Sequence, residues 1–219
     1  AGQTCIAAKR FILTPGIADA FVARFTAAAA ALAVGDPNDE ASTLAPMVRP
    51  DAREQLHAQV EASVRAGAKV LLGGTKGAGP CEYPATILDG VAPGMAAYSE
   101  ELFGPVLTVY VYDENKLEDT LKLVDSTSSY ALTGAIIAQD RYAIELATRK
   151  LQNSAGNFYI NDKPTGAVVG QQPFGGGRAS GTNDKAGSML NLYRWLSVRT
   201  IKEMLAPVAD YRYPFLGEK

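Results

Sequence analysis

The sequence is short of the residues that build disulfide scaffolds and zinc sites. Its 219 residues include two cysteines, Cys5 and Cys81, and one histidine, His57. Neither cysteine belongs to a Cys-x-x-Cys pair or a Cys/His cluster, which excludes a disulfide framework and a zinc centre, and no metal is expected. A Cys/His catalytic dyad has little support either, because His57 stands among polar residues on a predicted helix.

An excess of one charge and long apolar runs are lacking too. Lys and Arg number 21 against 23 Asp and Glu, so no basic surface is indicated for a nucleic acid. No apolar stretch approaches the roughly 20 residues of a membrane helix, and residues 1–25 carry no secretion signal. We therefore expect no nucleic-acid or membrane partner and a cytoplasmic location, or the mitochondrial matrix in a eukaryote.

Nucleotide-binding glycine motifs are lacking although the chain holds 21 glycines. The segments LLGGTKGAGP and FGGGRASG both fail the G-x-G-x-x-G pattern, because Glu82 and Ser180 stand where the last glycine is needed. Neither segment is a Walker A sequence. The first is better explained as a turn-rich connector.

What the chain does have is an alternation of short apolar runs with segments of helical period. Such alternation is typical of α/β folds in which helices cross over between parallel strands. We predict a parallel-rich sheet flanked by helices. The predicted strands are Arg10–Leu13, Lys69–Leu72, Ala85–Leu88, Leu107–Tyr112, Leu132–Ala138 and Phe158–Ile160, and the predicted helices are Ala18–Ala33, Asp51–Ala66, Leu117–Asp125 and Arg141–Leu151.

Two segments depart from this alternation. Residues 162–188 are rich in glycine and have no periodicity, and long irregular segments inside compact domains are usually functional, the alternative being a surface insertion without a role. Ser197–Glu203 alternates apolar and polar residues, which predicts a late edge strand that another subunit could cover.

Two candidate sites arise from the residues themselves. Cys5, between small and polar residues, is either a nucleophile or a buried small hydrophobe. Glu100 and Glu101, with Phe103 close behind, are either a solvated loop or an acceptor for sugar hydroxyls beside an aromatic ring. Composition alone leaves both alternatives open.

Four sequence blocks decide between them: GQTC at 2–5, SEELFGPV at 99–106, NFYIND at 157–162 and QQPFGGGRASG at 171–181. In this order and at this approximate spacing they resemble the aldehyde dehydrogenase superfamily over essentially the whole chain. The resemblance implies a thiol-bearing catalytic domain over residues 1–196. It also implies an oligomerisation strand and tail over residues 197–219, and hence a homo-oligomer.

The resemblance also assigns roles. Cys5 matches the nucleophile, Glu101 the residue that holds the nicotinamide ribose hydroxyls, and Phe103 the ring that borders the nicotinamide. The implied cofactor is NAD, or NADP, and the implied substrate a small aldehyde, oxidised to its acid through a thiohemiacetal and a thioester. In the superfamily the NAD-binding domain, the general-base glutamate and the oxyanion-hole asparagine come from chain preceding the cysteine, so they are not expected within these residues.

From about residue 98 onward the sequence resembles Δ1-pyrroline-5-carboxylate dehydrogenases, which oxidise L-glutamate γ-semialdehyde to glutamate. By that resemblance, backbone N–H groups at Gly166 and Ala167 bind the substrate α-carboxylate, and Phe174 packs against its aliphatic part. Residues 1–97 are more similar to succinate-semialdehyde dehydrogenases. Thr4 and Ile6 replace the Lys and Ser that usually flank the nucleophile in the first group, so Ile6 counts among the substrate-binding residues.

Three hypotheses follow from these features. The first is oxidation of glutamate γ-semialdehyde in proline catabolism, and the second is oxidation of succinate semialdehyde. The third is a non-catalytic module that folds and self-associates but is inactive alone. Residues 1–97 and the rest of the chain thus resemble different subfamilies. This difference would be seen in a divergent natural sequence, in an engineered or recombined chain, or in an imperfectly identified sequence.

Overall fold

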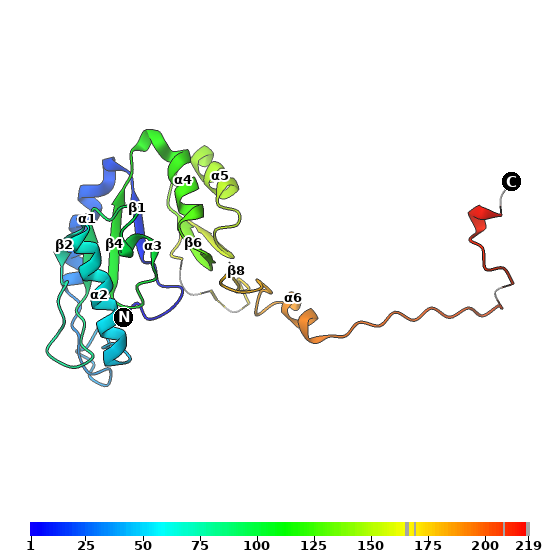
Figure 1. Cartoon of the computed structure of the whole chain (residues 1–219), viewed down its shortest axis with the longest axis horizontal. Coiled ribbons are helices and arrows are strands. Elements are labelled where there is room, and N and C mark those ends of the chain that lie inside the picture. Colours follow the sequence, from blue (N-terminus) through cyan, green and yellow to red (C-terminus); the bar gives the residue numbers. More distant parts are fainter. Residues whose placement is uncertain (165–166, 169, 208, 218–219) are drawn as a thin grey trace.

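A mixed four-stranded sheet forms the centre of the N-terminal half of the computed structural model, which describes residues 1–164, 167–168, 170–207 and 209–217. Its strand order is β1-β4-β3-β2. β1 (Arg10–Leu13) and β3 (Thr86–Asp89) lie parallel to the central β4 (Val106–Val111), and β2 (Lys69–Leu72) closes one edge in the antiparallel sense. The predicted parallel-rich sheet is confirmed (Figure 1).

Helices cover both faces of this sheet. α1 (Pro15–Ala30) packs on one face and α2 (Pro50–Arg65) on the other. Two successive residues of β3 show the division, since Ile87 joins the apolar cluster under α1 and Leu88 the cluster under α2, both fully buried. Side chains alternate across a strand, so this sheet is buried on both faces, as is usual for an α/β fold.

Proline sets where the two long helices begin. Pro15 and Pro50 each occupy the first helical turn, where a missing N–H costs nothing and a fixed φ favours the helix. The predicted starts at Ala18 and Asp51 were therefore three residues and one residue late. The short α3 (Ala96–Ser99), which the sequence did not reveal, packs against α2.

The second half of the body repeats the strand-helix-strand arrangement on a smaller scale. β6 (Thr133–Ile136) and β7 (Asn157–Ile160) pair in parallel, and α5 (Arg141–Lys150) joins them. α4 (Leu117–Ser126), entered through a 3-10 turn at Glu114–Lys116, packs beside α5. β6 is shorter than the predicted Leu132–Ala138, because the backbone N–H of Ala138 donates to the Asn161 side chain instead of a strand neighbour.

Two very short strands fasten the glycine-rich segment to this half. β5 (Tyr130–Ala131) pairs antiparallel with β8 (Gly177–Arg178). Strands of two residues have no period, so the sequence did not predict them.

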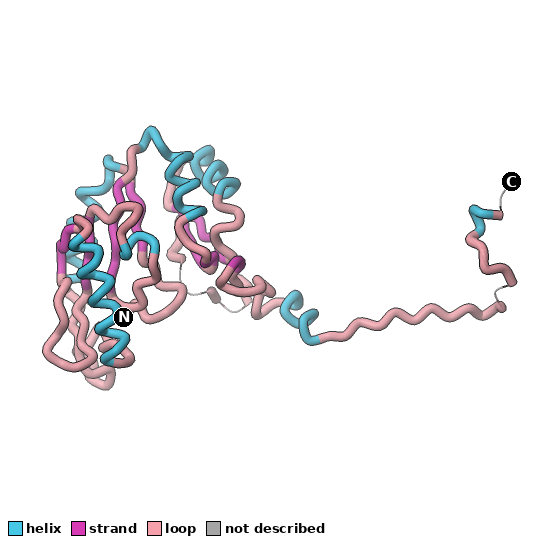
Figure 2. Tube along the Cα trace, in the orientation of Figure 1, coloured by secondary structure: helices cyan, strands magenta, loops and turns pink. Residues whose placement is uncertain are grey.

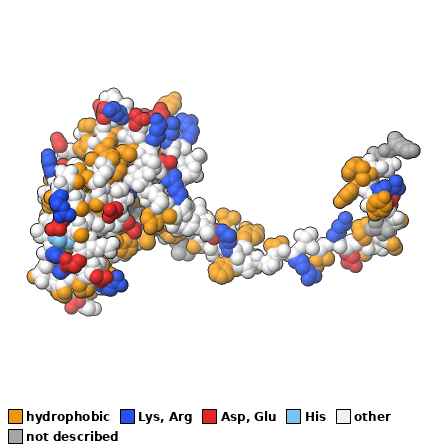
Figure 3. Space-filling model, in the orientation of Figure 1, with side chains coloured by type: hydrophobic (Ala, Val, Ile, Leu, Met, Phe, Trp, Pro, Cys, Tyr) orange, Lys and Arg blue, Asp and Glu red, His pale blue; other side chains and the backbone are white. Residues whose placement is uncertain are grey.

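The C-terminal segment extends away from the body as an arm (Figures 1 and 2). It begins with α6 (Met189–Leu192) and the turn Tyr193–Trp195, and it includes a last turn at Pro214–Leu216. Large apolar side chains are exposed along it, among them Trp195 and Leu205 at 82% and 95%, and Figure 3 shows them scattered over the arm.

The predicted strand Ser197–Glu203 has no hydrogen-bonded strand partner among the described residues of this one chain. An edge strand needs a second strand to pair with, so this element remains a prediction about an assembly. No helix in the described ranges has the length and apolar character needed to cross a membrane.

Gly104 offers a test of how tightly the sheet is packed onto α2. A methyl group there would collide with the Leu56 side chain and lie 3.1 Å from Met47 Sδ. We expect Gly104→Ala to lower the free energy of unfolding by about 1 to 3 kcal/mol through overpacking. Gly16→Ala, at an open position in the first turn of α1, is the control and should raise that free energy by about 0.5 to 1 kcal/mol. Urea unfolding measures both, and equal effects would contradict this packing.

Candidate active site

Cys5 stands on a tight turn just before β1. The backbone N–H of Ala7 donates to the carbonyl of Thr4 over 3.0 Å, which closes the turn around Cys5 and Ile6. The Cys5 side chain is exposed and Ile6 is half-buried. An exposed thiol on a fixed turn is accessible to a substrate. The alternative, that Cys5 is a buried small hydrophobe, does not agree with this exposure.

The two residues before this turn are anchors. Gln3 donates from Nε2 to the carbonyl of Pro46 over 3.2 Å and accepts at Oε1 from the N–H of Val48 over 2.8 Å. Gly2 has φ of +68° and lies against the backbone of Gly104, where any side chain would collide with the carbonyl oxygen. Gly2 and Gln3 therefore hold in place the turn at residues 4–7, which we call the thiol turn. Composition did not reveal this structural role.

The parallel pairing of β1 with β4 brings the thiol turn to the SEELFGPV segment. In parallel strands, the residues that precede each strand lie at the same end of the sheet. The register pairs Arg10 with Thr108, and Thr108 donates from its N–H and from its hydroxyl to the carbonyl of Lys9, both over 2.9 Å. Arg10 Nε in turn donates to the carbonyl of Tyr98 over 2.6 Å.

The two glutamates of that segment differ in their contacts. Gln59 of α2 donates from Nε2 to the Glu100 carboxylate over 2.8 Å and to the backbone carbonyl of Glu101 over 3.4 Å. The Glu101 side chain is exposed, and Phe103 is 40% exposed. Glu100 is thus tied to the scaffold, whereas the carboxylate of Glu101 and the ring of Phe103 face outward on the segment beside the thiol turn.

Lys9, which the sequence did not single out, lies between these groups. Its Nζ donates to the carbonyl of Thr4 over 3.2 Å and to that of Ala7 over 3.3 Å, and it lies 5.5 Å from the centre of the Phe103 ring. Burial lowers the pKa of Lys9, and the negative charges of Glu101 and of Cys5 act in the opposite direction. The structure therefore brings Cys5, Glu101 and Phe103 together around one lysine.

The glycine-rich segment presents Phe174 from a fixed backbone. Phe174 and Ala186 exchange two backbone hydrogen bonds, of 2.9 and 2.7 Å. The buried Asn157 side chain, at the start of β7, donates to the carbonyl of Pro173 and accepts from the N–H of Gly175, each over 3.1 Å. Every backbone polar group from Pro173 to the N–H of Gly175 is thereby paired, so the Phe174 side chain leaves a rigid support.

The predicted substrate residues Gly166 and Ala167 precede Phe174 in the same segment. Gly166 lies outside the described residues. Ala167 is half-buried, and the following N–H, of Val168, donates to the Gln172 side chain over 2.6 Å. Among the described residues, no hydrogen bond joins Ala167 or Phe174 to the turn that carries Cys5, so the substrate-binding roles of Ala167 and Phe174 remain predictions.

A polar cluster locks the far end of the glycine-rich segment. Arg178 of β8, a non-glycine residue at φ of +52°, donates to the Asp125 carboxylate and to its backbone carbonyl, both over 2.6 Å. Ser154 donates to the same carboxylate over 2.5 Å. This Ser154 hydrogen bond, with the Arg178 guanidinium, lowers the pKa of Asp125 against the opposing effect of burial.

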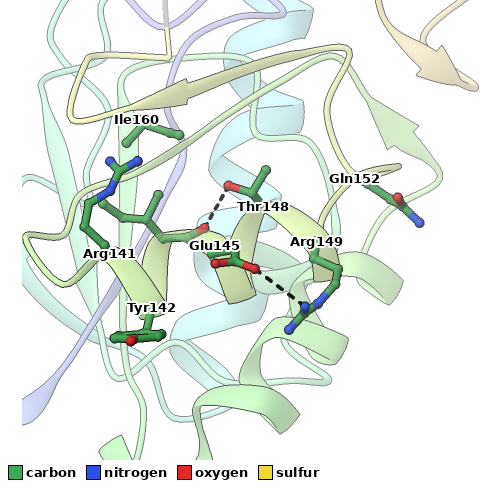
Figure 4. A pocket seen from close by; sticks show the side chains of 8 residues that line it. Arg141, Tyr142, Glu145, Thr148, Arg149, Gln152 and Ile160 are labelled. Carbon is green, nitrogen blue, oxygen red and sulfur yellow. Dashed lines mark hydrogen bonds and ion pairs between the residues drawn. The ribbon is translucent and has the colours of Figure 1, made fainter.

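One surface hollow lies away from these residues. A hollow of about 630 Å³ runs along α5 and is lined by side chains such as Tyr142, Arg149 and Ile160 (Figure 4). Three of its polar side chains have partners on the same helix, since Glu145 pairs with Arg149 at 3.8 Å and the Thr148 hydroxyl donates to the Ile144 carbonyl. None of the predicted site residues lines it. In the part of the chain that the structure describes, no cluster of three or more His, Cys, Asp and Glu could hold a metal.

The profile of the aldehyde dehydrogenase family matches residues 1–201. The chain belongs to this family. It is 45% identical over 218 residues to the mitochondrial Delta-1-pyrroline-5-carboxylate dehydrogenase of Dictyostelium discoideum, which covers 98% of this chain and 39% of that protein. The chain thus spans about two-fifths of the length of this family member.

Solved structures of the family have the same fold. The Delta-pyrroline-5-carboxylate dehydrogenase of Mycobacterium tuberculosis bound with NAD superposes with a TM-score of 0.81 at 40% identity, covering 98% of this chain and 39% of that one. Aldehyde dehydrogenase 21 of Physcomitrella patens, in complex with the reaction product succinate, reaches 0.75 at 29% identity over 83% of this chain and 36% of its own. The predicted likeness to the pyrroline-carboxylate enzymes is confirmed over nearly the whole chain, whereas the separate likeness of residues 1–97 to succinate-semialdehyde dehydrogenases remains a prediction.

The support of Phe174 predicts the effect of removing Asn157. We expect Asn157→Ala to lower the free energy of unfolding by about 1 to 3 kcal/mol, because the partly buried hydrogen bonds to the carbonyl of Pro173 and from the N–H of Gly175 are both lost. Thermal or urea unfolding measures this. Asn115→Ala, at an exposed asparagine in a 3-10 turn, is the control and should cost less than about 1 kcal/mol. A loss at Asn157 no larger than at Asn115 would contradict the proposed support.

Proposed function

We propose that this chain is the thiol-bearing catalytic part of an NAD(P)-dependent aldehyde dehydrogenase that oxidises L-glutamate γ-semialdehyde to glutamate. The observation that carries the proposal is the exposed Cys5, held on a rigid turn beside the outward-facing Glu101 and Phe103. A nucleophile, a carboxylate acceptor and an aromatic ring at one end of a sheet suit a thiol enzyme with a nicotinamide cofactor. The 45% identity to a pyrroline-carboxylate dehydrogenase supports the choice of substrate.

Cys5 would carry the covalent chemistry. Its thiolate adds to the aldehyde carbon, so that a C–S bond forms and the carbonyl electron pair moves to oxygen, giving a thiohemiacetal. Loss of hydride from that carbon re-forms the carbonyl as a thioester. Water then displaces the thiolate and releases the acid. A bound nicotinamide cofactor supplies the hydride acceptor.

Glu101 and Phe103 fit the cofactor's nicotinamide end. An exposed carboxylate can accept hydrogen bonds from both hydroxyls of a ribose, and the half-exposed ring offers an apolar edge beside it. The M. tuberculosis relative is an NAD complex, which supports NAD as the cofactor. These residues would fix the angle of the nicotinamide relative to the carbon on Cys5, and such positioning accounts for a large part of many rate enhancements.

The glycine-rich segment would hold the substrate. We place the backbone N–H groups at Gly166 and Ala167 on its α-carboxylate and the Phe174 ring against its methylene groups, since backbone donors suit an anion and a rigid ring suits an aliphatic chain. The fixed backbone around Phe174 supports this assignment.

Succinate semialdehyde is the second candidate, and the thiol turn favours it. Thr4 and Ile6 flank Cys5, where the pyrroline-carboxylate enzymes usually carry Lys and Ser that contribute to recognition of their substrate. Aldehyde dehydrogenase 21 of P. patens, crystallised with succinate, is a more distant relative at 29% identity, which favours the first candidate.

A homo-oligomer is part of the proposal. The arm after residue 188 exposes large apolar side chains, including Trp195, Val198 and Leu205, that a single chain leaves in water. Exposed apolar surface of this extent is typical of an association interface. We place the predicted strand Ser197–Glu203 in that interface.

The substrate is tested with the full-length protein. We expect kcat/KM with NAD to be at least about tenfold higher for glutamate γ-semialdehyde than for succinate semialdehyde, because a misplaced or missing charged contact costs about 1.5 to 3 kcal/mol. A preference for succinate semialdehyde would decide for the second candidate. The non-catalytic module is tested with the 219-residue chain alone: turnover would reject it, and labelling of Cys5 by thiol reagents without turnover would support it.

The nucleophile is tested by substitution in the same protein. Cys5→Ser should lower kcat by at least about 10³-fold, since loss of a covalent nucleophile removes the step on which the others depend. Cys81→Ser is the matched control and should leave kcat within about twofold, because Cys81 packs against the core cluster under α2. Steady-state NADH formation reports both, and retention of activity in Cys5→Ser would disprove the mechanism.

A further inference from the structure

We propose that Lys9 is a positioning residue for the Cys5 nucleophile, fixing the turn that carries it and placing a positive charge beside the thiolate. The inference rests on the proposed function in taking Cys5 as the nucleophile. It adds a residue that the sequence blocks and the comparisons leave without a role, four positions after the thiol.

The geometry of the turn is the first support. The turn closes with the N–H of Ala7 on the carbonyl of Thr4, and both residues also offer their carbonyl oxygens to Lys9 Nζ. One ammonium therefore binds the carbonyls at the two ends of the segment that carries Cys5. An ammonium has three N–H donors and no acceptor, so it suits a site made of carbonyl oxygens.

The placement of Lys9 itself is the second support. Its own carbonyl accepts the N–H and the hydroxyl of Thr108 on β4, which fixes its backbone to the sheet. Its side chain is half-buried and lies above the Phe103 ring at 5.5 Å. A lysine held at its backbone and at its ammonium has little freedom, so its charge stays beside the turn.

The charges facing Lys9 are Glu101 and Cys5, which favour its protonated form, and Arg10, which disfavours it. A fixed cation beside a thiol favours the thiolate, which is the reactive form. Glu101 is also a predicted ribose ligand, so Lys9 shares its charge between the thiol turn and the cofactor side of the site. Lys9 thereby links the nucleophile to the two residues that would orient the nicotinamide.

The test measures the alkylation rate of Cys5 by iodoacetamide against pH in the 219-residue chain, with Cys81 followed by peptide mass spectrometry as an internal reference. In Lys9→Met we expect alkylation at pH 7 to slow by about three- to tenfold, because a nearby charge that favours the reactive thiolate is lost. Lys9→Arg should remain close to the unmodified chain. Lys69→Met, at an exposed lysine of β2, should change nothing.

Salt gives a second measurement that needs no substitution. Raising the ionic strength screens a partly exposed charge, so alkylation of Cys5 at pH 7 should slow in the unmodified chain and hardly change in Lys9→Met. If Lys9 only held the turn in place, without an effect of its charge, alkylation of Cys5 would depend on salt neither in the unmodified chain nor in Lys9→Met. The proposal is overturned if the Lys9→Met profile superimposes on that of the unmodified chain, or if Lys9→Arg is displaced as far as Lys9→Met.

The assay uses neither aldehyde nor cofactor, so its outcome is separate from that of the proposed function. If Lys9→Met changes the alkylation of Cys5 but the protein has no dehydrogenase activity, the role of Lys9 is supported and the proposed reaction is rejected. Normal dehydrogenase activity with an unchanged profile would reject the role of Lys9 alone.

Discussion

The parallel pairing of β1 with β4 is the constraint on which the rest of the site depends. The Cys5 turn precedes one strand and the segment with Glu101 and Phe103 precedes the other, so this register alone brings residues almost a hundred positions apart to one end of the sheet. Gly2 against Gly104 and Thr108 on the carbonyl of Lys9 then set the distance. If the register slipped by one residue, the side chains of β1 would exchange faces and the apolar cluster under α1 would be lost.

Much of this arrangement could be predicted from the sequence, because the scaffold follows simple periods. Strands such as Arg10–Leu13 and Lys69–Leu72 have the predicted bounds, and α5 begins at the predicted Arg141, where Asp140 caps the helix by accepting from the N–H of Tyr142. The two-residue strands β5 and β8 were not predicted, since they form through pairing between segments far apart in the chain rather than from a local pattern.

Less of the candidate site than of the fold could be predicted from the sequence. Cys5, Glu101 and Phe103 came from a resemblance, and their proximity is what the structure adds. Lys9 and Asn157 were missed because their importance lies in which backbone groups they bind, information that no spacing carries. Functional side chains are recognisable by type, whereas the residues that hold them are recognisable only by contact.

The central claim is that Cys5 becomes covalently joined to the oxidised carbon of glutamate γ-semialdehyde. The most direct test mixes the full-length protein with this substrate and NAD, quenches the reaction rapidly with acid, and analyses the peptides by mass spectrometry. The account predicts a glutamyl thioester on the peptide that contains Cys5 and none on the peptide that contains Cys81. Turnover without an adduct on Cys5 in the quenched samples, or an adduct on Cys81 alone, would contradict it.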